Sequence, residues 1–172
     1  MANPPEIWLR GPIHGIPHLL GPVAHALVQA REDVASSVAG VTREALWMRP
    51  NGAASAGFHL FHAAHALDRL MTYARGESLQ DEQLHALARE RSGDLDGNSA
   101  DLIRLVEATV DRALRQLRCT PEASLLSERR VGRGEPPSTV LGLLFHAAEH
   151  TTRHTGQVIT TLKIVSGTRV PT

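Results

Sequence analysis

The sequence predicts an all-α protein, a four-helix bundle with additional short helices, formed by a single domain over residues 1–172. Four long segments repeat apolar residues at steps of three and four, which is the spacing of an α-helix, and no segment between them alternates like a strand. Pro and Gly gather between these segments, where they interrupt helices. A chain of 172 residues is also long enough to bury its own core without disulfides.

Capping residues and helix breakers set the expected limits of each element. The motifs NPP, GP, GIP and GP break any helix within residues 1–22. Thr42 is the expected N-cap of a short helix, and Ser138 is that of the last long helix. RGES ends the second long helix, Pro121 marks the end of the third, and ERRVGRGEPPS is expected to be a loop. The predicted helices are residues 23–39, 42–47, 55–74, 79–93, 99–117 and 139–165.

Composition and charge exclude several classes of function. Lys plus Arg and Asp plus Glu both number 18, and basic residues cluster only in ERRVGRG, so nucleic acid is not an expected partner. No apolar run approaches the roughly 18 residues of a membrane span, and the first residues lack the apolar segment of a signal peptide. The single cysteine, Cys119, excludes an intramolecular disulfide, and nothing marks it as a nucleophile. We therefore expect a cytoplasmic protein that acts on a small molecule.

Histidines form a row in the last predicted helix. His146, His150 and His154 follow one another at steps of four in LFHAAEHTTRHTGQV. Each step turns the side chain by about 40° around the helix axis, so the three rings form one slowly drifting ridge. The ridge interrupts a helix that otherwise consists largely of Leu, Phe, Ala, Val and Ile.

A second histidine cluster lies in the second long helix. His59, His62 and His65 are spaced by three in GFHLFHAAHALDRLM, and each step turns by about 60°, so at most two of them can share a site. The aliphatic stripe of this helix does not decide which, because Phe58 and Phe61 make it apolar on nearly every side. The pentapeptide LFHAA occurs in both helices, at residues 60–64 and 144–148.

Imidazole clusters of this kind are typical of metal sites. Neutral histidine is the commonest protein ligand for Zn, Ni, Cu and Fe ions, and two histidines at i and i+4 can converge on one ion. A third histidine from another helix completes a three-histidine site with coordination positions left for water or substrate. Hydrogen-bonded core or surface histidines are the simpler alternative, but two clusters on two helices favour metal.

One local motif suggests a different chemistry. His146, Glu149 and His150 fit H-x-x-E-H, the inverted zincin pattern, in which both histidines bind zinc and Glu acts as general base. Three fixed positions in five residues are a weak signal, and the pattern ignores His154. A small bundle also lacks an evident cleft for an extended peptide. A hydrolase of this type is the lesser alternative.

Three stretches, TREALWMRP, SAGFHLFHAAHALDRL and FHAAEHTTRHTGQV, resemble the DinB-like superfamily of four-helix-bundle metalloproteins. Trp47 and Pro50 match its Trp-x-x-Pro element, and Ser55 followed by His62 matches the segment that opens its second helix. The H-x-x-x-H-x-G-Q signature of its last long helix is matched by His150, His154, Gly156 and Gln157.

The resemblance implies that His62, His150 and His154 are the metal ligands. The expected ion is divalent, zinc or nickel first and iron or cobalt as alternatives, about 2.0 to 2.2 Å from each ring nitrogen. A fourth ligand remains open among histidines to which the resemblance assigns no role, namely His25, His59, His65 and His146.

The resemblance also implies a range of activities. Characterised relatives include transferases and isomerases that use a low-molecular-weight thiol held by the metal, and many other members have no known reaction. A non-enzymatic, metal-stabilised or stress-related bundle is the opposing hypothesis. Trp47 and Tyr73 are expected to be packing residues. A carboxylate substrate could be held by one of three arginines, although a solvated face or loop is the simpler role for each: Arg69, Arg130 and Arg153.

Apolar residues around the first long helix predict self-association. That helix is apolar on most sides, and relatives of the resembling family are often homodimers. We therefore expect a two-fold homodimer through this helix or the N-terminal segment. The alternative is that apolar residues of the N-terminal segment cover the helix within the monomer, namely Ile7, Trp8, Leu9, Ile13 and Ile16.

Overall fold

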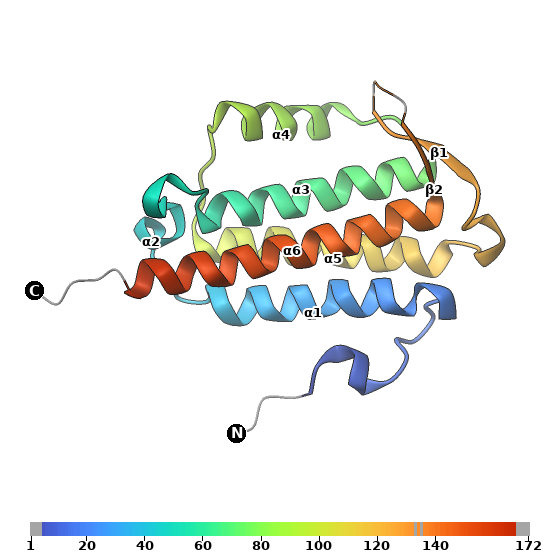
Figure 1. Cartoon of the computed structure of the whole chain (residues 1–172), viewed down its shortest axis with the longest axis horizontal. Coiled ribbons are helices and arrows are strands. Elements are labelled where there is room, and N and C mark those ends of the chain that lie inside the picture. Colours follow the sequence, from blue (N-terminus) through green and yellow to red (C-terminus); the bar gives the residue numbers. More distant parts are fainter. Residues whose placement is uncertain (1–4, 133, 135, 168–172) are drawn as a thin grey trace, which may run out of the picture.

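Four long helices form the bundle that the sequence predicts. The computed structural model describes residues 5–132, 134 and 136–167. Within them α3 packs against α5 and α6, and α1 packs against the same two helices, so the four lie side by side (Figure 1). The expected all-α class is therefore confirmed. The bounds of these helices are α1 Gly21–Val38, α3 Ala56–Arg75, α5 Ser99–Cys119 and α6 Val140–Gly167.

Local signals place α3, which carries the first histidine cluster. The Ser55 side chain caps the helix by accepting a hydrogen bond from the Phe58 N–H at 3.1 Å. Gly76 ends it in the left-handed conformation, with φ of 80°, which glycine adopts without steric cost. The predicted aliphatic stripe faces the core, and all its members are buried: Leu60, Ala64, Leu67, Met71 and Ala74.

Two short strands precede α6, so the expectation of a loop over ERRVGRGEPPS is wrong at both ends of that stretch; its residues 133 and 135 lie outside the described residues. Strand β1, Glu128–Arg130, pairs antiparallel with β2, Pro137–Thr139. Three-residue strands are too short to show a periodic pattern, which is why the sequence did not reveal them. The pairing places Ser138 opposite Arg129, and Thr139 takes the predicted capping role of Ser138 by accepting from the Gly142 N–H at 3.0 Å.

Two shorter helices lie outside the bundle. Helix α2, Arg43–Trp47, begins after Thr42, whose hydroxyl accepts from the Ala45 N–H as predicted. Helix α4, Asp81–Ser92, contacts the outer side of α3 (Figure 1). The Trp47 ring lies directly over Gly57, so it is a packing residue as expected.

The N-terminal segment covers part of α1. A 3₁₀ turn at Ile7–Arg10 buries Ile7, whose N–H donates to Gln29 Oε1 of α1 at 2.9 Å. Its neighbour Trp8 is 63% exposed.

The GP motif at residues 21–22 was expected to interrupt a helix, but it forms the start of α1. Pro22 lies in the first turn of the helix, where its missing N–H has no hydrogen bond to lose.

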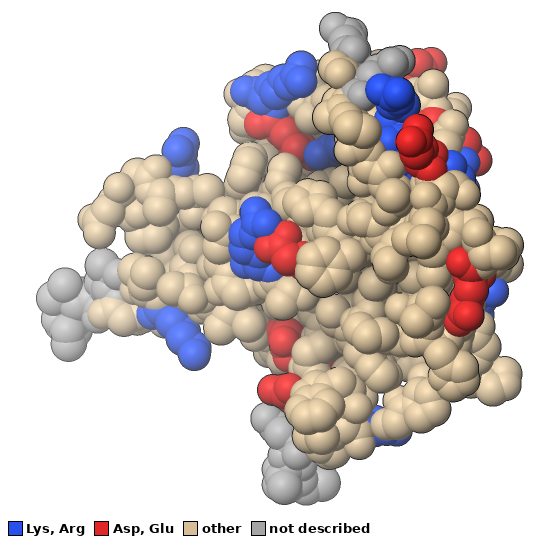
Figure 2. All heavy atoms as spheres, turned by 45° about the vertical axis from the view of Figure 1, so that its right-hand side comes forward, with Lys and Arg blue, Asp and Glu red and all other residues tan. Residues whose placement is uncertain are grey.

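The surface mixes charges of both signs. On the face drawn in Figure 2, basic and acidic side chains lie beside one another across the uncharged surface. Exposed ion pairs of the chain include Arg10–Glu32, at 2.8 Å, and Arg43–Asp96, at 2.6 Å. Among the described helices, none is both long and apolar enough to cross a membrane.

Candidate metal centre

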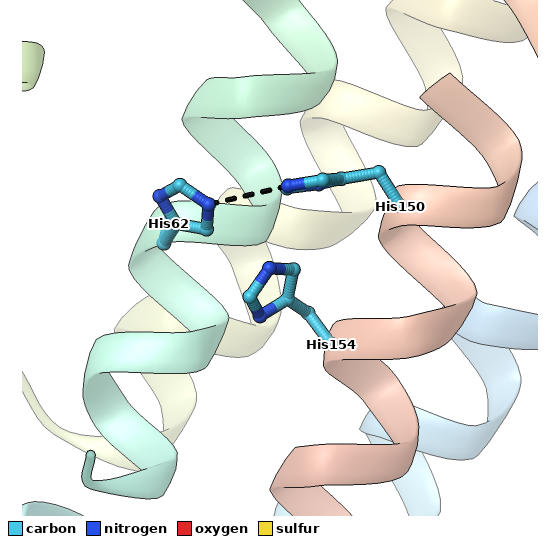
Figure 3. A group of neighbouring side chains, drawn as sticks. All are labelled: His62, His150 and His154. Carbon is cyan, nitrogen blue, oxygen red and sulfur yellow. Dashed lines mark hydrogen bonds between the residues drawn. The ribbon is translucent and has the colours of Figure 1, made fainter. Parts of the chain in front are cut away.

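Three histidines meet between α3 and α6, as Figure 3 shows. His62 comes from α3, and His150 and His154 come from successive turns of α6. Each offers one ring nitrogen, and these three atoms all lie within 4.8 Å of one another. Nε2 of His62 lies 3.3 Å from Nε2 of His150. The structure therefore brings together the three residues predicted as ligands.

Burial keeps His150 and His154, the two triad members on α6, uncharged at neutral pH. It lowers the pKa of His150 to about 4, and the nearby rings of His62 and His146 add to the effect. Burial likewise lowers the pKa of His154 to about 3, with His150 and His62 contributing. A neutral imidazole has a free lone pair, which is the form that binds a metal.

The donor set fits a divalent ion. Two nitrogens that are each about 2.1 Å from one tetrahedral ion lie roughly 3.4 Å apart, close to the spacing of the two Nε2 atoms described above. Three imidazoles suit zinc, nickel, cobalt or iron. The other ring nitrogen of His150, Nδ1, is buried without a hydrogen-bond partner in the described part of the chain.

His59 belongs to the same cluster but is not a member of the triad. Its Nδ1 lies 3.0 Å from Nδ1 of His154, and its side chain is buried. Burial, with a smaller contribution from His62, also lowers the pKa of His59. The helical spacing had left open which rings of α3 share a site, and in the structure both His59 and His62 contact His154.

The remaining candidate histidines lie elsewhere. His65 packs on the Phe61 ring, with ring centroids 4.3 Å apart, and the Nε2–H of His25 donates to the Gly11 carbonyl at 3.0 Å. The side chain of His146 is 50% exposed, and its Nδ1 lies 3.5 Å from Glu149. Glu149 is itself paired with Arg153. The inverted zincin residues are therefore not gathered into a site with His150.

A buried ion pair supports the triad from outside the four-helix bundle. Nδ1 of His62 lies 2.8 Å from Oε2 of Glu90, which comes from α4. Arg69 of α3 donates to both oxygens of this carboxylate, at 2.8 and 3.2 Å. Burial by itself would raise the pKa of Glu90, but the hydrogen bonds from His62 and Arg69 outweigh it and hold that pKa below its ordinary value.

The sequence did not single out Glu90. It lies in a mostly polar segment, residues 79–93, that contains two other acidic residues, so its carboxylate did not stand out. Arg69 was considered as a partner for a substrate carboxylate, and the structure shows that it holds a carboxylate of the chain itself. Arg153 is engaged in the same way by Glu149.

Comparison with known proteins agrees with this fold. The sequence model of the DinB superfamily matches residues 26–158, so the chain belongs to that superfamily. A solved structure described as the conserved protein of locus from Enterococcus faecalis has the same fold, with a TM-score of 0.64 at 19% identity, over 86% of this chain and 97% of that chain. No curated protein matches the chain.

Proposed function

We propose that the protein binds one divalent metal ion through His62, His150 and His154, and that it is a metal-dependent enzyme using a low-molecular-weight thiol. The observation that carries the proposal is the convergence of three ring nitrogens within 4.8 Å in a chain of the DinB superfamily. Zinc or nickel is the proposed ion, with iron or cobalt as alternatives. The reaction would be an S-transfer, or a related hydrolysis or isomerisation, on a small cytoplasmic substrate.

The chain's own residues contribute orientation and unprotonated ring nitrogens. Three imidazoles fill only part of a coordination shell, so a thiol has a position to occupy. When bound, the ion supplies a positive charge that favours the thiolate form of that thiol. Burial of His150 and His154 keeps their nitrogens unprotonated, and Glu90 contacts the outer nitrogen of His62.

A non-enzymatic, metal-stabilised bundle is the second candidate. It is favoured by the position of the triad, which bridges α3 and α6, the two helices that pack together most extensively. An ion at this point would join them and stabilise the fold by binding only the folded state. Both candidates use the same ligands, so they differ only in whether a thiol reacts.

Metal analysis of protein purified without a histidine tag tests the shared part of both candidates. We expect stoichiometric metal in the wild type and in His146→Ala, and none in His150→Ala. His146 and His150 are one helical turn apart on the same ridge, which makes His146→Ala a matched control. Full metal retention in His150→Ala would contradict the site. Loss of metal in His146→Ala would favour the inverted zincin pattern, in which His146 and His150 both bind zinc.

A thiol screen separates the two candidates. The metal-loaded protein is incubated with an electrophile and bacillithiol, mycothiol or glutathione, and the loss of free thiol is followed. The enzyme hypothesis predicts consumption that depends on the metal and disappears in His150→Ala. Absence of consumption with every metal would leave the metal-stabilised bundle.

We also propose a homodimer that uses α1 or the N-terminal segment. Ile7 is used within the monomer, but Trp8 presents an exposed indole beside a groove that α1 forms with α6. Exposed aromatic side chains next to apolar grooves are common at interfaces. Light scattering at micromolar concentration distinguishes the dimer from a single chain of 18.6 kDa, and the smaller mass would contradict the dimer.

A further inference from the structure

Glu90 contacts the histidine triad without belonging to it. Its side chain is 6% exposed, and its Oε2 lies 2.8 Å from Nδ1 of His62. It is 28 residues away from His62 in the sequence and reaches it from α4, outside the four-helix bundle. A carboxylate is rarely buried unless its charge is compensated, so this one requires a reason.

Arg69 compensates the charge and orients the carboxylate. It lies seven residues after His62, two helical turns along the same face of α3, so both side chains point toward α4. Its guanidinium donates to both oxygens of Glu90, and its own side chain is 11% exposed. The carboxylate is therefore held in one orientation between a cation and a histidine.

The chemistry of a carboxylate determines the direction of the His62 hydrogen bond. An ionised carboxylate only accepts hydrogen bonds, so Nδ1 of His62 must carry the proton and donate it. In a neutral ring, Nε2 then has the free lone pair, and this is the atom that lies 3.3 Å from His150 Nε2. The contact with Glu90 thus selects the tautomer that faces the site.

The other two triad members lack an equivalent constraint. Nδ1 of His154 contacts Nδ1 of His59, and either nitrogen can be the donor. This contact therefore selects no single tautomer of His154. Nδ1 of His150 has no partner among the described residues. Within the triad, His62 is the member whose ring is oriented by a charged group.

We propose that Glu90, held by Arg69, is a positioning residue that fixes His62 as the Nδ1–H tautomer and directs its Nε2 into the triad. The inference rests on the proposed function in one respect only, namely that Nε2 of His62 binds a metal ion. Because Glu90 belongs to α4, the orientation of the His62 ring depends on the packing of α4 against α3. Outer carboxylates that hold a metal-binding histidine in this way raise metal affinity in other metal sites.

Two variants distinguish the loss of the Glu90 carboxylate, which accepts from His62, from the loss of Arg69 alone. Arg69→Met with Glu90→Met removes the acceptor and leaves no unpaired buried charge, and apolar replacements of this kind are often tolerated. Arg69→Met alone removes the same arginine but keeps the carboxylate against His62. If Arg69→Met does not fold, Arg69→Lys replaces it as the control that retains Glu90.

The readout is the tautomer of His62 in metal-free protein. Long-range ¹H–¹⁵N spectra of histidine-labelled protein report which ring nitrogen carries the proton, and the loss of signals in His62→Gln assigns them. We expect the Nδ1–H form in the wild type and in the Arg69→Met control, and loss of that preference in the double variant. Persistence of the Nδ1–H form in the double variant would overturn the inference.

Zinc affinity provides the second readout. We expect a decrease of about 10- to 100-fold in the double variant and a smaller change in the control, as for other outer-shell partners. Unchanged affinity despite a lost tautomer preference would overturn the positioning role. If the wild type binds no metal, the proposed function fails, while the tautomer measurement still decides whether Glu90 orients His62.

Discussion

The pentapeptide LFHAA occurs in α3 at residues 60–64 and in α6 at residues 144–148, and the two copies have different environments. The leucine and both alanines are buried in each copy. The phenylalanine is 4% exposed as Phe61 but 64% exposed as Phe145. The histidine joins the triad as His62, whereas His146 remains at the surface beside Glu149.

The difference comes from what lies against each helix. In both copies the leucine and the alanines occupy positions i, i+3 and i+4, the inner stripe of an amphipathic helix. The phenylalanine and the histidine fall on the flank, where a neighbouring element decides their environment. For α3 that neighbour is α4, which places Arg89 over the Phe61 ring at 5.1 Å and Glu90 against His62. Local sequence therefore determined which residues form the buried stripe. The presence or absence of a neighbouring helix determined the environment of the phenylalanine and the histidine.

The largest expected difference between the copies concerns metal. His62→Ala should lose stoichiometric zinc because one of the three proposed ligands is removed, and His146→Ala should retain it. Zinc content after dialysis, compared with the wild type, measures the effect. Equal zinc in the two variants would mean that the copies do not differ in function.

The two phenylalanines should differ strongly in their contribution to stability. Phe61→Ala is expected to lower the free energy of unfolding by about 3 to 5 kcal/mol, the usual loss for a buried ring. Phe145→Ala should change it by no more than about 0.5 kcal/mol, because that ring is already largely in water. Urea unfolding of metal-free protein gives both values, and a large loss in Phe145→Ala would reveal a partner on that side of α6.

Two glycines extend the comparison to the backbone of the same helices. A Cβ at Gly57 of α3 would lie 2.8 to 2.9 Å from the Trp47 ring, so Gly57→Ala should lower the free energy of unfolding by roughly 1 to 3 kcal/mol. A Cβ at Gly156 of α6 meets nothing within 4 Å. Gly156→Ala should raise stability by about 1 kcal/mol through helix propensity. The same unfolding experiment tests both, and opposite signs are the expected result.

The smallest expected effect concerns the contact of the Arg89 guanidinium with the Phe61 ring. Arg89→Ala removes the cation above the ring and should cost about 0.5 to 1 kcal/mol. Arg91→Ala, an exposed position on the same helix, should change stability by no more than about 0.5 kcal/mol. Equal effects in the two variants would show that the contact with the ring contributes nothing.

Much of the fold could be predicted because its signals are local. Thr42 caps its helix as expected, and Ser55 and Gly76 delimit α3 within one residue of the prediction. These signals act between residues three or four positions apart. The hairpin before α6 was missed for the opposite reason, since Arg129 and Ser138 pair across a turn and neither strand is long enough to show a pattern.

The site was predictable only in part. His150 and His154 are one turn apart, so spacing alone placed them on one ridge, but spacing could not choose among His59, His62 and His65. The family resemblance supplied His62, and the structure brings it to the other two. That choice depends on how α3 is rotated against α6, which no single helix encodes.

The sequence by itself determined the helices, their buried stripes and the presence of two histidine clusters, because periodicity and capping operate within a few residues. Only the tertiary structure decided which rings converge and which charged group orients them. Glu90 and His62 are 28 residues apart and on different helices, so their contact exists only once α4 packs on α3. The same packing gives two identical pentapeptides different environments, because the environment of a side chain is set by all the elements that surround it in space.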